Sequence, residues 1–231
     1  MSSIQTLFDA GAHYALSRAR RHPTAARYIF ATKDRTDIFD LEETGKRLET
    51  AQEFAKSLGG KHLLFVGGKH EVAELVKAAA LHANTPYVAG RWIGGTLTNF
   101  KNIRKRIDRL QRLMDERDSG AREKYTKRER LLMDREIEEL LFRFGGLVQM
   151  TELPAAVFVV DTRHENTAVR EANQLGIPVV GLSSSDCDFS LVQYPIPAND
   201  TSVRCVRLVC DKIAEAYQEG KKVPAAHAPK A

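Results

Sequence analysis

The sequence predicts an α/β protein, in which a doubly wound parallel sheet carries a protruding antiparallel coiled-coil helical hairpin. Three observations predict this fold. Short, continuously apolar segments alternate with segments of helical periodicity, as in parallel strands buried between two layers of helices. A long insertion with two apolar seams of its own interrupts this alternation. The chain has 231 residues, 43% of them hydrophobic, which is enough for one large domain with an insertion.

Residues 1–40 are expected to form a basic N-terminal arm and a small β-hairpin. The segment 13–35 holds six basic residues and one acidic residue. The runs YIFAT and TDIFD flank Lys33-Asp34-Arg35, as two short strands flank a turn. The segment lacks the apolar run of a secretory signal, and the three cysteines form no CxxC pair. We therefore expect a cytoplasmic protein with free thiols.

The predicted α/β domain consists of residues 41–98 and 148–220. A helix opens it, because Leu41, Leu48 and Leu58 recur at helical spacing before a glycine pair. The elements that follow alternate as in flavodoxin-like and Rossmann-like sheets. They are strands at 62–68, 86–90, 155–161, 177–182 and 194–196, and helices at 70–83, 166–175 and 200–219. The Pro/Ala/Lys-rich tail, 221–231, is expected to be disordered.

Residues 99–147 are predicted to form the inserted hairpin. Apolar residues step by three and four along both of its helices, as they do in a coiled coil. The first seam contains Phe100, Ile103, Ile107, Leu110 and Met114, and the second contains Met133, Ile137, Leu140, Phe144 and Leu147. Thr126 and Glu129 match a capping box that opens the second helix. Because the two seams can bury each other, we expect the hairpin to project from the body.

The surplus positive charge is confined to two segments of the chain. The formal net charge is +5, yet residues 13–35 carry +5, residues 100–144 carry +4 and the remainder sums to −4. Within the insertion, the first helix has six basic residues and one acidic residue, whereas the second has five of each. A solvated face does not require one helix to be much more basic than the other, whereas a polyanion-binding surface does require a local excess of positive charge. We therefore predict phosphate contacts from the arm and from the root of the first helix.

Two motifs leave an enzymatic alternative open. Gly67-Gly68-Lys69 follows a strand and opens a helix, where a phosphate often sits, but it matches neither GxGxxG nor the P-loop. Residues Asp161 to Glu165 lie at the carboxyl end of a strand, without a nucleophile at a recognisable spacing. A sugar-phosphate or nucleotide-binding enzyme would use these two motifs. A tight turn and a helix-capping loop are the more frequent roles of such segments.

The segment RWIGGTLTNF, residues 91–100, is more specific. Trp92 is the only tryptophan, and we expect it to anchor the root of the hairpin. Gly94-Gly95 permits a close backbone approach or a positive φ. Thr98 and Asn99 place short polar groups at the start of the basic helix. Such groups cap a helix, and the free N–H groups beside them also bind phosphate.

RWIGGTLTNF resembles the diagnostic motif of the S-two family of small-ribosomal-subunit proteins, bacterial type. Further segments resemble this family in the same order: GAHYALSRARRHPTAARYIF, LLFVGGK, AVFVVDTRHENTAVREANQLGIPVVGL and YPIPANDTSVRCVRLV. The resemblance covers residues 4–220 and implies a structural, non-catalytic subunit bound to small-subunit ribosomal RNA. It also implies contacts with other small-subunit ribosomal proteins. Family members help attach the large mRNA-binding ribosomal protein in many bacteria, so we include that protein among the expected partners.

We therefore predict a constituent of the cytoplasmic ribosome that neutralises phosphates, while RNA shape supplies selectivity. The predicted RNA contacts are Arg18, Arg20, Arg21, Arg27, Lys33 and Arg35 in the arm, and Arg91, Thr98, Asn99, Lys101, Arg104 and Lys105 at the hairpin root. No cofactor, membrane or small-molecule substrate is expected. A zinc site at Cys187 has the wrong spacing, and Leu16 replaces a second histidine of the family, so no metal is assigned. The remaining alternative is a coiled-coil scaffold that recruits a protein through the hairpin.

Overall fold

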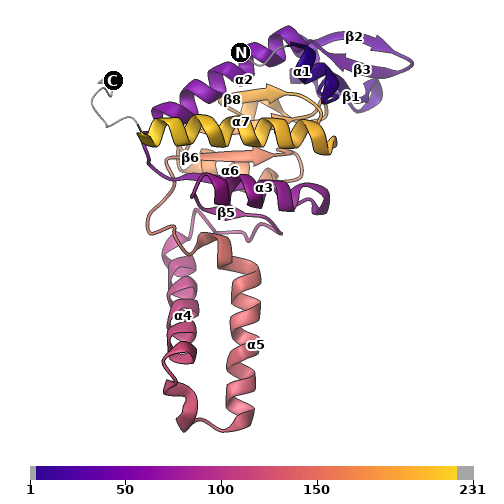
Figure 1. Ribbon diagram of the computed structural model, residues 1–231. Helices are drawn as coiled ribbons and strands as arrows, with labels where there is room; N and C mark the ends of the chain where they lie inside the picture. Colours follow the sequence, from indigo (N-terminus) through magenta and orange to yellow (C-terminus); the bar gives the residue numbers. More distant parts are fainter. Residues whose placement is uncertain (1–3, 223–231) are drawn as a thin grey trace.

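A five-stranded parallel sheet forms the centre of the computed structural model, which describes residues 4–222 (Figure 1). Its strands are β4 (Leu63–Val66), β5 (Tyr87–Val88), β6 (Ala156–Val160), β7 (Val179–Ser183) and β8 (Tyr194–Pro197). Their spatial order is β5-β4-β6-β7-β8, which is the order of flavodoxin-like doubly wound sheets. β4, β6 and β7 are buried along their whole length, which explains their continuously apolar sequences. The predicted α/β fold is confirmed.

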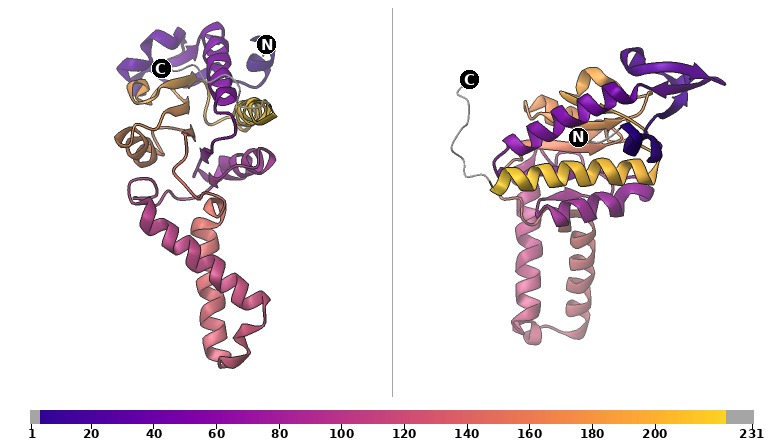
Figure 2. Two further views of the ribbon diagram at one scale, coloured as in Figure 1. Left: turned by 90° about the vertical axis from the view of Figure 1, so that its left-hand side faces the viewer. Right: turned by 45° about the horizontal axis from the view of Figure 1, so that its top comes forward.

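Helices cover both faces of the sheet, so the core has two layers. In Figure 2, left, the yellow α7 and the orange α6 lie on opposite sides of the strands. One face carries α2 (Leu41–Ser57), α3 (His70–His82) and α7 (Val203–Lys222), and the other carries α6 (Asn166–Gln174) and the root of the helical hairpin. Side chains alternate along each strand, so Leu63 and Phe65 of β4 enter the first layer, whereas Leu64 and Val66 enter the second.

The predicted helical hairpin consists of α4 (Phe100–Asp118) and α5 (Lys127–Phe144), which project from the body (Figure 1). The buried seam of α4 ends at Leu113 rather than at the predicted Met114, which is only partly buried. A short helix, η3 (Ala121–Lys124), fills the end of the hairpin. Its buried Arg122 donates to the Leu113 carbonyl and to Asp134 at 2.6 Å. The first of these hydrogen bonds attaches η3 to α4 at Leu113, which is the last buried residue of the α4 seam.

Local sequence sets the ends of these helices. The predicted capping box of Thr126 and Glu129 is confirmed, with both of its reciprocal hydrogen bonds present. Asp40 caps α2 by accepting from the N–H groups of Glu42 and Glu43. α5 ends at Phe144, and Gly145 begins the short helix η4 (Gly145–Leu147). The second helix of the hairpin therefore ends where the glycine pair Gly145-Gly146 begins.

The N-terminal segment holds more structure than the sequence predicts. A short helix, α1 (Ile4–Asp9), precedes β1 (Tyr14–Ser17). β1 pairs with β3 (Thr36–Phe39), which also pairs with β2 (Ile29–Lys33), so the expected two-stranded hairpin is a three-stranded antiparallel sheet. β1 has no alternation of buried and exposed residues, which is why its sequence does not indicate a strand.

The arm is folded against the loop that follows β7. Of its helices η1 (Arg18–Arg20) and η2 (Pro23–Tyr28), η2 contacts η5 (Phe189–Leu191). The His22 N–H donates to the Ser185 carbonyl at 2.8 Å, and the Tyr28 ring lies 4.8 Å from that of Phe189. At the other end of the chain, α7 extends through Lys222, so the first two residues of the predicted disordered tail are helical. The rest of that tail lies outside the described residues. Within residues 4–222, no helix is long and apolar enough to cross a membrane.

Candidate nucleic-acid interface

The RWIGGTLTNF segment wraps around a single carboxylate, that of Glu171 on α6. The Trp92 indole N–H and the Gly95 N–H donate to its Oε1 at 3.1 and 2.8 Å. Its Oε2 accepts from the N–H groups of Leu97 and Thr98 at 3.0 and 3.2 Å, and from the Thr98 hydroxyl at 3.2 Å. Burial acts to raise the pKa of Glu171, but these hydrogen bonds outweigh it and lower the pKa below its ordinary value.

This arrangement decides between the two roles considered for the segment. The N–H groups that would bind a phosphate already bind Glu171, so the loop is organised by an internal anion. Thr98, a predicted RNA contact, uses both its N–H and its hydroxyl in this way. Trp92 is buried among the residues of the hairpin root, so its predicted role as an anchor is confirmed.

Glu171 itself was not predicted from the sequence. It lies on the buried face of α6, together with Ala168 and Ala172. A carboxylate on the apolar face of an amphipathic helix is the signal that could have indicated it, because a buried charge requires a partner.

At the hairpin root, Arg104 is occupied by its own chain. Its guanidinium donates to Asp108 at 2.9 Å and to Gln111 at 3.2 Å. It also donates to the carbonyls of Val148 and Met150, at 3.3 and 3.0 Å, in the segment that leads to β6. The structure therefore does not support Arg104 as a phosphate contact. Its planar group fastens α4 to the segment that follows the hairpin.

Three other cations at the root are free of intramolecular partners. Arg91, Lys101 and Lys105 are exposed, and their side chains form no ion pair or hydrogen bond among residues 4–222. Asn99 precedes α4 without a side-chain capping bond, and its amide oxygen accepts from Asn102 at 2.9 Å. We refer to Arg91, Lys101 and Lys105 below as the root cations.

The arm shows the same division between free and engaged cations. Arg18, Lys33 and Arg35 are exposed, and their side chains have no ion-pair or hydrogen-bond partner within the described part of the chain. These three are called the arm cations below. The other three engage their own chain: Arg20 lies 3.5 Å from Asp186, Arg21 lies 3.6 Å from the buried Asp37, and Arg27 lies 4.7 Å from the centre of the Tyr28 ring.

Two of the arm cations, Lys33 and Arg35, lie at a tight two-residue turn between β2 and β3. Asp34 and Arg35 both have positive φ, of 49° and 63°. Two successive residues in this region are typical of the type I′ turn, which matches the twist of a two-stranded hairpin. Neither residue is glycine, so the turn costs conformational free energy that the flanking strand pairing offsets. The turn presents Lys33 and Arg35 to solvent together.

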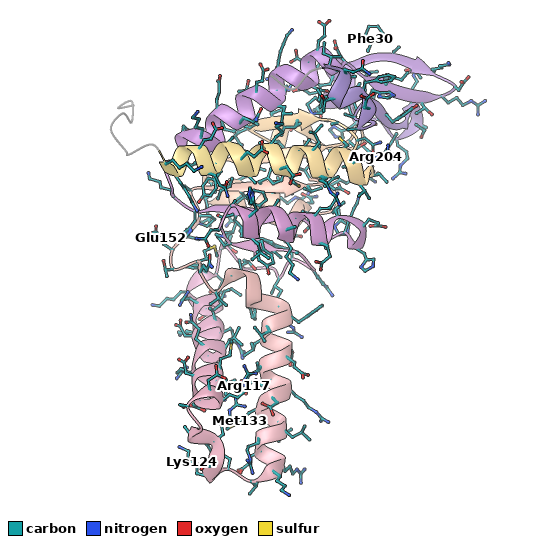
Figure 3. The ribbon with its side chains drawn as sticks, in the orientation of Figure 1. Phe30, Arg117, Lys124, Met133, Glu152 and Arg204 are labelled. Carbon is teal, nitrogen blue, oxygen red and sulfur yellow. The ribbon has the colours of Figure 1, made fainter. Side chains whose placement is uncertain are left out.

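The arm and the helical hairpin lie at opposite ends of the body. Figure 1 shows the β2–β3 sheet at one end and the α4–α5 pair at the other, and Figure 3 places Phe30 and Lys124 at these two extremes. The sheet order agrees, because β5, which leads to the hairpin, is one edge strand, and β8 is the other. The predicted contacts therefore form two separate surfaces.

The crevice where enzymes of this fold bind ligands is filled by side chains of the protein itself. Doubly wound sheets bind ligands at the carboxyl ends of the strands where the strand order reverses, here between β4 and β6. The Gly68 N–H donates to the buried Glu165 carboxylate at 3.0 Å. A Cβ at Gly68 would lie 2.6 Å from the Gly90 carbonyl oxygen, so the glycine is needed for close packing. The tight-turn role of the glycine pair is supported over phosphate binding.

Lys69 supplies a positive charge to the same crevice. Its ammonium group binds the Asp161 carboxylate and lies 3.8 Å from that of Asp200. Burial raises the pKa of Asp200 to about 6, and that of the neighbouring Cys187 to about 12. Asp161, Cys187 and Asp200 approach within 4.8 Å of one another, as metal ligands do. Lys69 already provides the charge compensation that a cation would give, and Asp161 also caps the following loop through the N–H groups of Arg163 and His164.

The chain is thus a doubly wound α/β protein whose crevice is filled by its own side chains and whose extensions carry exposed cations. The family model described as Ribosomal protein S2 matches residues 7–220, and the chain therefore belongs to this family.

Three similar proteins are each named small ribosomal subunit protein uS2. Those of Syntrophobacter fumaroxidans, Coprothermobacter proteolyticus and Roseiflexus sp. strain RS-1 are 40%, 41% and 42% identical to this chain. Each match covers 95% of this chain, and 81%, 83% and 84% of the respective relative. The resemblance inferred from the sequence motifs is confirmed. The chain is a structural ribosomal protein of the small subunit in the cytoplasmic ribosome, where it acts in translation, and it is not an enzyme.

Proposed function

We propose that the chain binds small-subunit ribosomal RNA through two separate basic surfaces, one on the arm and one at the hairpin root. The observation that carries this proposal is that six of the predicted contacts, three in each place, are exposed cations without intramolecular partners among residues 4–222. Cations that are already paired gain little from a phosphate, whereas unpaired cations release counterions from RNA when they bind. Phosphate contacts of this kind position the protein, and the spacing of the two surfaces selects for RNA shape.

The proposal predicts a steep dependence of RNA affinity on salt. The full chain is titrated with small-subunit ribosomal RNA at several salt concentrations. Reversing Lys101 and Lys105 to glutamate is expected to reduce affinity by at least about tenfold and to lower the salt slope by about two. Reversing Lys33 and Arg35 to glutamate is expected to reduce the affinity and the salt slope by similar amounts. The effects of the two double reversals should add, because the two surfaces lie apart.

The charge control is Arg207→Glu, which changes the net charge by two units, whereas each double reversal changes it by four. Arg207 is exposed on α7, outside both surfaces, and its reversal changes the net charge without touching the proposed contacts. If it weakens binding as much as the reversals at the arm and root do, binding depends on net charge alone and the two-surface proposal fails.

We further propose that neighbouring small-subunit ribosomal proteins, among them the large mRNA-binding one, contact this chain. The support is an apolar surface on the arm, where Phe8, Tyr14 and Phe30 are 52%, 56% and 76% exposed around a shallow groove. A pull-down from ribosomal proteins that survives nuclease treatment, and that Phe30→Ser abolishes, is the expected result.

Two structural predictions also stay proposals: the division of the chain into an arm, a domain and an insertion, and the coiled-coil supercoil of α4 and α5.

A further inference from the structure

A cleft lies where the root of the helical hairpin meets the edge of the sheet. It has a volume of about 700 Å³ and is lined by α3, β5, the loop after β5 and the end of α5. β5 is an edge strand of two residues, so no further strand covers its outer side. The backbone at Gly90 and Gly94 forms part of the cleft wall, with open space beside it, because a Cβ added at either glycine would meet no atom within 4 Å.

Phe142 lines one side of this cleft. Its side chain is 87% exposed, more than that of any other large hydrophobic residue between positions 4 and 222. The buried seam of α5 passes through Leu140 and Phe144 instead, so the Phe142 ring has no packing role in the hairpin. An exposed aromatic face of this kind is the usual stacking platform for an unpaired base.

Cations outnumber acids around the same cleft. Its lining contains Lys77, Arg91 and Arg143, and Glu74 is the one acidic residue among the lining residues. Lys77 lies 3.7 Å from Glu74, and Arg143 lies 2.8 Å from Glu139. Arg91 is the member that has no partner within the described part of the chain, so it is the group available to a ligand phosphate.

We infer that this cleft holds one unpaired nucleotide of RNA, with its base stacked on Phe142 and its phosphate beside Arg91. The inference rests on the proposed function, because it takes RNA as the ligand. The cleft volume of about 700 Å³ falls within the range of roughly 300–1,000 Å³ that small-ligand sites occupy. The excess of positive charge favours a nucleotide over an apolar peptide. A peptide strand added to the sheet would also need a longer edge than two residues offer.

The test uses the full chain and a short single-stranded RNA that carries the fluorescent base 2-aminopurine, which aromatic stacking quenches. Wild-type protein is expected to quench the base. Phe142→Leu is expected to weaken binding about tenfold and to remove the quenching, because it keeps apolar bulk but loses the π-face. Phe142→Trp restores both. Arg91→Gln is expected to weaken binding and to reduce the salt slope by about one.

Two controls separate this inference from the proposed function. Leu131→Ala removes an exposed apolar side chain from the same helix, away from the cleft, and is expected to change neither affinity nor quenching. Lys33→Glu tests an arm cation. If Phe142→Leu leaves affinity and quenching unchanged while Lys33→Glu weakens RNA binding, the cleft inference is overturned and the proposed function stands. If reversals at the arm and root leave the affinity for ribosomal RNA unchanged, the proposed function fails.

Discussion

Glu171 shows how one side chain sets the shape of a functional segment. Its two oxygens accept five hydrogen bonds from the loop between β5 and α4. Because the loop precedes α4, the position of the root cations depends on this carboxylate. An anion supplied by the protein therefore fixes the surface that we propose binds RNA phosphates.

Glu171→Gln is expected to destabilise the fold by about 2–3 kcal/mol, because an amide offers one acceptor oxygen and sets its NH₂ against the loop donors. The pKa of Glu171 is lowered in the folded state, so its stabilising effect is present at neutral pH and is lost as the pH falls. Urea unfolding, followed by the fluorescence of Trp92, measures the loss. The exposed Glu49→Gln serves as the control, and an equal effect there would contradict the assignment.

The pH dependence expected from Asp200 is opposite in sign to that expected from Glu171. Burial raises its pKa from 3.8 to about 6, so the folded state binds its proton more tightly than the unfolded state does. The associated stability is present at low pH and is lost as the pH rises through 6. Asp200→Asn should therefore gain about 3 kcal/mol relative to wild type between about pH 4 and pH 7. Urea titrations of both proteins across this range measure the difference, and a constant difference would refute the prediction.

At the scale of the elements, the junction between the hairpin and the sheet is closely packed. Gly146 lies against β5, where an added Cβ would approach the Tyr87 carbonyl oxygen to 2.3 Å. Gly146→Ala is therefore expected to cost about 1–3 kcal/mol, since the backbone must shift to admit the methyl group. At Gly145 the nearest atom is 3.8 Å away and φ is −55°, so Gly145→Ala should change stability by less than about 0.5 kcal/mol. Thermal unfolding of the two variants measures the difference between their losses of stability. Equal losses would show that the close contact of Gly146 with Tyr87 does not determine the effect of the substitution.

Elements with strong periodicity could be predicted from the sequence, whereas those defined by distant partners could not. The apolar runs of β4, β6 and β7 and the spacing of Ile107 and Leu110 predict buried faces directly. β1 is a strand only because β3 lies beside it. Likewise, the charge of Arg104 predicts a phosphate contact, but two of its four hydrogen-bond partners lie 44 and 46 residues away along the chain. Counting charges along the sequence identifies basic segments. The structure is needed to identify which of their cations have no intramolecular partner among the described residues.

At the scale of the whole molecule, the hairpin has a root that packs on the sheet and an outer part that packs only on itself. Replacing residues 111–136 with a short Gly/Ser linker keeps Ile107, Leu110 and Leu140, together with the root cations. We expect the body to retain its stability within about 1 kcal/mol, because the lost contacts are internal to the outer part, apart from the hydrogen bonds of Arg104 to Gln111 and of Arg109 to Glu136. We also expect the affinity for ribosomal RNA to stay the same. Urea unfolding and RNA titration of the shortened chain test both statements, and a large loss of affinity would place RNA contacts on the outer part.

The filled crevice between β4 and β6 has a consequence for stability. Many sheets of this architecture leave that position to a cofactor, and their stability then follows the supply of that cofactor. Here Lys69, Asp161 and Glu165 occupy it permanently. We therefore expect the stability of the isolated chain to be independent of any small-molecule ligand supplied to this crevice.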